Sequence, residues 1–155
     1  MRSHVRVHGD AVDVAALMRL VSSPASGATA SFVGTVRDHN DDLHVTSLEY
    51  EAYVPIAERS LQRIALLLGE RHDLEAIAIE HRTGMLAVGD VAVAVVAAAV
   101  HRHAALAACS EAIDLIKREV PIWKREHHPD GARWLDGCSD VVEEAEHGET
   151  RAHAR

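Results

Sequence analysis

The sequence has 155 residues, of which 48% are hydrophobic, and a formal net charge of −8. This length fits one globular domain with or without a short tail. The negative charge disfavours nucleic acid and anionic membranes as partners of the whole molecule, so an anionic ligand needs a local basic cluster. The longest apolar run, Val91 to Val100, is too short to span a bilayer as a helix and predicts a buried strand.

The redox setting follows from the cysteines. Cys109 and Cys138 lie far apart in the sequence and form no CxxC pair, which favours a reduced, cytoplasmic setting with structural or incidental thiols. The opening residues, MRSHVRVHGD, contain no apolar signal core. We therefore expect no export.

Strand-like and helical runs of apolar residues alternate along the N-terminal half. Asp10 or Asp13 suits a helix N-cap, and Pro55 suits the first turn of a second helix. The cluster DHNDD has the short polar side chains that favour a turn. In chain order we expect a strand at His4–His8, a helix to Val21, strands at Ala28–Arg37 and Val45–Ala52, and a helix from Pro55 to Arg71.

The C-terminal half continues with a second long helix. A stripe spaced 3, 4, 3 and 4 predicts its apolar face, and Pro121 ends it. The stripe consists of Leu106, Cys109, Ile113, Ile116 and Val120. The expected elements are a strand at Leu74–His81, the loop RTGMLAVGD, the strand at Val91–Val100, a helix at Ala104–Glu119, an extended piece, a PDG turn and a strand at Ala132–Leu135.

This element order mixes hairpin-like and crossover connections, which predicts a two-layer α+β fold with two long helices. Residues 138–155 are polar and lack periodicity, so we expect a domain over 1–137 followed by a flexible tail. Both tryptophans, Trp123 and Trp134, flank a basic stretch, and we expect them to anchor it on the core.

Basic residues fall at the ends of the predicted elements. Arg37 closes a strand, and His101-Arg102-His103 joins a strand to a helix start, where free N–H groups favour anions. Lys117 lies in the last turn of that helix, and Lys124 follows Pro121 by three residues. If the corner at Pro121 brings the two ammonium groups together, either lysine suits nucleophilic or acid–base chemistry.

Each candidate also has an ordinary structural interpretation. Lysine near a helix C-terminus complements the helix dipole, and lysine on an edge strand opposes aggregation. A metal site built from His101, His103, His127, His128 and a cysteine fits no recognised zinc spacing. If His127 and His128 lie in a strand, they point in opposite directions.

Six segments in order resemble the large, catalytic subunit family of molybdopterin synthase. They are FVGTVRDHN (32–40), LEYEAYVPIAERSL (48–61), HRTGMLAVGD (81–90), VHRHAAL (100–106), IKREVPIWKRE (116–126) and GARW (131–134). The resemblance implies an α/β-hammerhead fold with a mixed or antiparallel sheet. It also implies a sulfur transferase that makes the dithiolene of molybdopterin from cyclic pyranopterin monophosphate.

The same resemblance implies the partners. They are a second copy of the chain, giving a homodimer, and a small ubiquitin-like sulfur-carrier subunit whose C-terminal Gly-Gly thiocarboxylate supplies sulfur. Together these form a heterotetramer that acts on a phosphorylated pterin and needs no metal or organic cofactor. The alternative is a noncatalytic protein of the same fold that binds the carrier or a pterin.

The family's site residues transfer onto positions of this sequence. Lys117 and Lys124 correspond to the catalytic lysines, with Lys117 central and Lys124 stabilising developing negative charge. The substrate-binding positions are Thr35, Val36, Arg37, His101, Arg102, Lys117, Lys124, Arg125 and Glu126. The chain departs from the family at Asp136, where a basic residue is common, so Cys138 gains no catalytic role.

Overall fold

The computed structural model describes residues 1–135, so the 137/138 domain boundary, the tail and Cys138 lie outside the described residues. Its first sheet has the strand order β1-β6-β8-β2, with β1 parallel to β6 and the other neighbours antiparallel. These strands are β1 (Arg2–His8), β2 (Ala28–Thr35), β6 (Leu74–Arg82) and β8 (Val91–Ala99). We call this four-stranded layer the main sheet.

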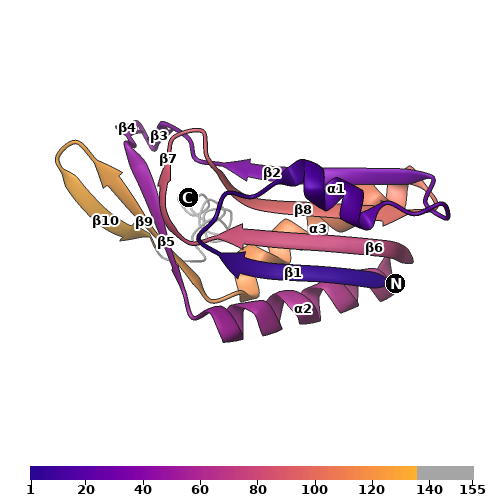
Figure 1. Cartoon of the computed structure of the whole chain (residues 1–155). Coiled ribbons are helices and arrows are strands. Elements are labelled where there is room, and N and C mark those ends of the chain that lie inside the picture. Colours follow the sequence, from indigo (N-terminus) through magenta and orange to yellow (C-terminus); the bar gives the residue numbers. More distant parts are fainter. Residues whose placement is uncertain (136–155) are drawn as a thin grey trace, which may run out of the picture.

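A second sheet crosses one end of the main sheet (Figure 1). Its order is β10-β9-β5-β7, and all its neighbours are antiparallel. The strands are β5 (Ser47–Ala52), β7 (Gly84–Ala87), β9 (Ile122–His128) and β10 (Gly131–Leu135). We call this layer the cross sheet, and we call the end of the main sheet beside it the junction.

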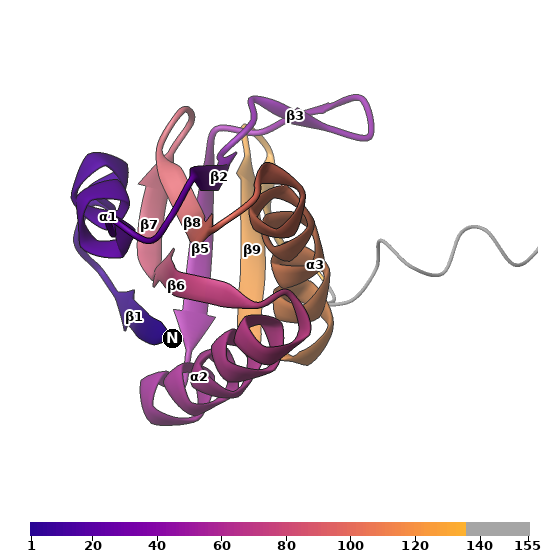
Figure 2. The ribbon, with the colours of Figure 1, turned by 90° about the vertical axis from the view of Figure 1, so that its right-hand side faces the viewer.

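Three helices cover the main sheet. The long helices α2 (Val54–Arg71) and α3 (Arg102–Glu119) lie on one face, and the short helix α1 (Val14–Val21) lies on the other (Figure 2). The Asp13 side chain caps α1 by accepting a hydrogen bond from the Ala16 N–H at 2.9 Å. The predicted α+β fold with two long helices is confirmed, and α1 adds a partial third layer.

The core of the main sheet consists largely of small side chains. From Ala92 to Ala99 every residue of β8 is buried. On α3 the buried face is Ala105, Ala108, Cys109, Ala112, Leu115 and Ile116. The predicted stripe was therefore wrong at Leu106, which is 60% exposed, because alanines let the helix pack closely against the sheet.

Two segments predicted as turn and loop contain strands. The DHNDD segment forms a hairpin of β3 (His39–Asn40) and β4 (Leu43–His44), with Asp41 and Asp42 at positive φ in a two-residue turn. The RTGMLAVGD segment contains β7, which begins at Gly84 and is followed by Gly89, at φ of 86° and 90°. Glycine tolerates this left-handed backbone, so the chain can turn at both ends of β7.

Candidate active site

The predicted site residues fall into two groups within one chain. Val36 donates its backbone N–H to Asp90 O at 3.0 Å, so Arg37 follows directly at the junction. His101 and Arg102 follow the other end of β8, because Ala28 pairs with Ala99 and Thr35 pairs with Val91. The nine residues of β8 separate the two groups by about 30 Å of extended chain.

Helix α3 carries the chain back to the junction. Arg102 begins the helix, and Lys117 lies fifteen residues later, or about 22 Å along its axis, in the last turn. The cap at Val120 is extended, and Pro121 leads into β9 (Figure 1). Arg37, Lys117 and Lys124 thus belong to the junction group, whereas His101 and Arg102 lie at the far end.

Lys124 lies on the inner face of the cross sheet. Its cross-strand partners are Tyr50 on β5 and Leu135 on β10, and it shares a face with Ile122 and Glu126. Tyr50 packs against the buried cluster of Val36, Val45, Leu48, Leu86 and Ala92. Lys124 is therefore partly buried at the boundary between this cluster and the charged residues of β9.

Arg125 lies on the outer face. Its guanidinium carbon is 5.5 Å from the centroid of the Trp134 ring, and its Nη1 is 3.8 Å from Glu49 Oε2. His127 on the same face is 3.2 Å from that carboxylate oxygen. The side chains of Arg125 and Lys124 therefore project from opposite faces of the cross sheet. One chain does not direct both of them to the same place.

The tryptophans do not anchor the basic stretch on the core, so that prediction was wrong. Trp123 is 50% exposed and Trp134 is 49% exposed. Trp134 contacts the Arg125 guanidinium instead, which is a cation–π arrangement on the sheet surface. Both rings lie on the outer face of the cross sheet because they alternate with inward-facing neighbours.

Two of the predicted binding residues have buried side chains. Val36 is 3% exposed within the junction cluster, and its carbonyl accepts from the Gly89 N–H at 2.9 Å. Glu126 is also 3% exposed and accepts a hydrogen bond from Asn40. Thr35 and Arg37 are exposed, so Arg37 is the side chain of this strand end that can reach a dissolved anion.

Sequence reasoning missed an aromatic pair beneath the site. Tyr50 and His81 meet edge to face with centroids 5.0 Å apart. Burial lowers the pKa of His81 to about 4, although the hydrogen bond from its Nδ1–H to Arg82 O opposes the shift. Burial, reinforced by the Glu126 carboxylate, raises the pKa of Tyr50 to about 12. At neutral pH both groups are uncharged.

The histidines of the alternative metal site are not gathered in one place. His127 and His128 belong to β9 and point to opposite faces, toward Glu49 and toward His44 respectively, as predicted for a strand. His101 and His103 lie at the start of α3. Within residues 1–135, no three His, Cys, Asp or Glu side chains are arranged to hold a metal ion.

Cys109 is the cysteine within the described residues. Its thiol is buried under α3 and donates to Ala30 O at 3.5 Å, and burial raises its pKa. This thiol packs within the core cluster between α3 and the main sheet. The helices of this part of the chain include none with the length and apolar character needed to cross a membrane.

The crossed sheets and the helix-covered main sheet define an α/β-hammerhead protein. A family model described as MoaE protein matches residues 7–119. That match covers well over half of the sequence, and the chain therefore belongs to the MoaE family.

Individual relatives agree with this assignment. A molybdopterin synthase catalytic subunit 1 from Mycobacterium tuberculosis is 41% identical over 132 residues, which cover 85% of this chain and 90% of the relative. The crystal structure of molybdopterin synthase from Staphylococcus aureus superposes with a TM-score of 0.82 at 33% identity, covering 84% of this chain and 96% of that one.

A more distant likeness supports the fold alone. A protein–protein complex of subunits 1 and 2 of molybdopterin-converting factor from Helicobacter pylori contains a chain that superposes with a TM-score of 0.70. The sequence identity is 19%, and the match covers 84% of this chain and 89% of that one.

Proposed function

We propose that this chain is the catalytic subunit of a molybdopterin synthase. It converts cyclic pyranopterin monophosphate to molybdopterin by transferring sulfur from the C-terminal thiocarboxylate of a small carrier subunit. The observation that carries the proposal is the 41% identity to a molybdopterin synthase catalytic subunit over 85% of the chain. The lysines of the junction supply groups suited to this chemistry.

Each junction residue has a role that follows from its chemistry. Arg37 is exposed and always charged, so it holds the phosphate of the pterin through paired N–H donors. Lys117 is the central acid–base or covalent group. Lys124, fixed by strand pairing beside Tyr50, stabilises negative charge that develops during transfer.

The separation of the two groups supports a site made from two copies of the chain. His101 and Arg102 cannot join Arg37 within one protomer, because β8 and the whole length of α3 lie between them. If they act on the same substrate, they come from the partner copy of a homodimer. The start of α3 then presents its free N–H groups, with Arg102, to an anion at the partner's junction.

The small subunit completes the assembly. The Helicobacter pylori structure is a complex of subunits 1 and 2 of molybdopterin-converting factor, and we propose a two-component assembly for this chain as well. We propose one ubiquitin-like carrier on each protomer, so that two carriers and two copies of this chain form a heterotetramer in the cytoplasm. The carrier's Gly-Gly tail reaches Lys117 and Lys124 at the junction.

A reconstituted reaction tests the function. The full chain is mixed with thiocarboxylated carrier and cyclic pyranopterin monophosphate, and the dithiolene product is measured. The proposal predicts product with the wild-type chain. Binding of both partners without any product, when each partner is competent with a known synthase, would identify a noncatalytic binding protein instead.

A further inference from the structure

The Glu126 carboxylate is buried between two strands and a hairpin. Its Oε1 accepts a hydrogen bond from Asn40 Nδ2 on β3 at 2.9 Å. Its Oε2 lies 3.5 Å from His128 Nε2 on β9 and 3.8 Å from Arg133 Nη2 on β10. A carboxylate with 3% exposure is costly unless such partners compensate for lost water.

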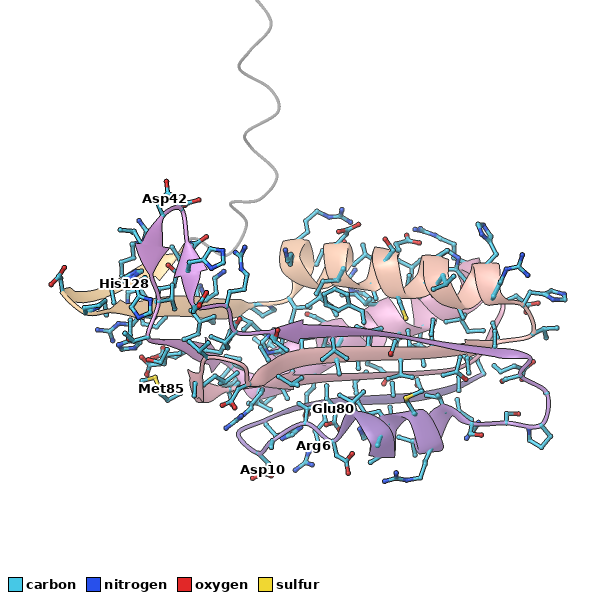
Figure 3. All side chains as sticks on the ribbon, turned by 90° about the horizontal axis from the view of Figure 1, so that it is seen from above. Arg6, Asp10, Asp42, Glu80, Met85 and His128 are labelled. Atoms are coloured by element: carbon cyan, nitrogen blue, oxygen red, sulfur yellow. The ribbon has the colours of Figure 1, made fainter. Side chains whose placement is uncertain are left out.

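His128 makes a second connection to the same hairpin. Its Nδ1–H donates to the backbone carbonyl of His44 on β4 at 2.8 Å, and Figure 3 shows His128 beside the hairpin whose tip carries Asp42. The opposite ring nitrogen faces Glu126 Oε2, and neither atom has a hydrogen bond to any residue in 1–135. The His128 ring therefore lies between the Glu126 carboxylate and the backbone of β4.

These contacts join the segment that carries Arg37 to the strand that carries Lys124. Val36 is fixed by two backbone hydrogen bonds, and the hairpin after Arg37 is closed by Val45 N–H donating to Asp38 O at 2.8 Å. Lys124 lies two residues before Glu126 on the same face of β9. Glu126 and His128 are thus two side chains through which β9 contacts the hairpin.

We propose that Asn40 and His128 are positioning residues that hold the β3–β4 hairpin on β9 through Glu126 and thereby set Arg37 relative to Lys124. This inference rests on the proposed function, because Arg37 and Lys124 are binding and catalytic groups there. It assigns Glu126 a positioning role in place of the predicted substrate contact. A correctly placed Arg37 is expected to lower the KM for the pterin more than it raises kcat.

Hydrogen exchange tests the connection without any assay of activity. In the full chain, peptides covering residues 38–46 are compared between wild type, Asn40→Ala, Glu126→Ala and His127→Ala. Asn40→Ala and Glu126→Ala each remove a hydrogen bond to a buried charge. The backbone amide hydrogens of the hairpin are therefore expected to exchange at least about tenfold faster in these two variants. His127→Ala is the matched control, because His127 is the neighbouring histidine on the outer face.

Kinetics and a conservative variant separate positioning from a merely structural role. Asn40→Ala is expected to raise the KM for the pterin about tenfold and to change kcat less than about threefold. In Glu126→Gln the amide oxygen still accepts from Asn40, and the amide N–H₂ faces His128 Nε2, to which it can donate. The hairpin of this variant is expected to exchange its amide hydrogens at the wild-type rate.

Two results would overturn the inference. One is wild-type exchange of the hairpin in both Asn40→Ala and Glu126→Ala. The other is a Glu126→Gln variant as impaired as Glu126→Ala, because the negative charge would then act on the substrate or on Lys124 and not on the hairpin. A wild-type chain that makes no product would instead remove the proposed function, whatever the exchange data show.

Discussion

The two ends of the main sheet differ in what they bury. Toward the far end the layers are almost wholly apolar, with Ala97, Ala98 and Ala99 of β8 at most 1% exposed. Toward the junction, the buried polar or charged side chains of the described residues are Glu80, His81 and Glu126. The far end therefore buries an apolar core, whereas the junction buries charged and polar groups that need partners to compensate for lost water.

Among the described residues, Glu80 and Glu126 are the buried carboxylates at the junction. Different partners compensate each of them for the loss of water. Burial raises the pKa of Glu80, but hydrogen bonds from His4 at 2.8 Å and His8 at 3.0 Å outweigh it, so the pKa is lowered overall. Glu126 is held by the hairpin and β10 instead. Figure 3 shows Glu80 near α1, on the far side of the main sheet from the hairpin.

The largest expected effect is on turnover at the junction. Lys117→Ala should lower kcat by about a thousandfold, within the usual range for the loss of an acid–base group. Its thermal melting should stay at the wild-type temperature, since Lys117 is exposed. Arg118→Ala, one residue along the same helix, is the matched control and should keep activity. Normal turnover in Lys117→Ala would remove the central role of this lysine.

Changes on the helix-covered face should instead affect stability. Leu61 on α2 is fully buried, so Leu61→Ala should lower the free energy of unfolding by about 2 to 5 kcal/mol. The remaining folded protein should keep the wild-type KM, because the cavity lies under α2 and away from Arg37 and Lys124. Denaturant unfolding and kinetics below the melting temperature check both parts. A KM that changes together with stability would contradict this separation.

His81 makes the junction sensitive to acid. Its pKa of about 4 in the folded state lies below the ordinary value of 6.5, so the unfolded chain binds the proton more tightly. Stability is therefore full above pH 6.5 and falls as the pH drops toward 4, by up to about 3 kcal/mol from this group. In His81→Gln, the fall between pH 6.5 and 4 should be smaller by that amount. If the free energy of unfolding fell equally with pH in the two proteins, His81 would not titrate in this way.

The smallest expected effect concerns the outer face of the cross sheet. Trp134→Ala removes the ring beneath Arg125 and should cost about 0.5 to 1 kcal/mol of unfolding free energy. Turnover should change less than about twofold, because this face points away from Lys124. Trp134→Phe should recover part of the loss. A large drop in activity would place Arg125 and its ring in the site.

Much of the fold is predictable from local patterns. The apolar run gave β8, and Asp13 and Pro55 marked the starts of α1 and α2. The buried faces were harder to predict, because the core contains many alanines that a search for large apolar residues overlooks. The hairpin was missed because its strands are two residues each, too short for any periodicity.

The site was only partly predictable for a different reason. Lys117, Lys124 and Arg37 were identified from element ends and from the family resemblance, but strand register decides which of them share a face. Register put Lys124 inside and Arg125 outside. The roles of Asn40 and His128 depend on contacts across more than eighty residues of sequence, which no local pattern contains.

Complementation between two variants tests the central claim, that one site needs both ends of the chain from different copies. Lys117→Ala and Arg102→Ala are each expected to be inactive as homodimers. When they are unfolded together and refolded as a mixture, half of the dimers pair one variant with the other. Each mixed dimer then has one intact site, so about a quarter of wild-type activity should return. A mixture as inactive as its components would contradict a site shared between two chains.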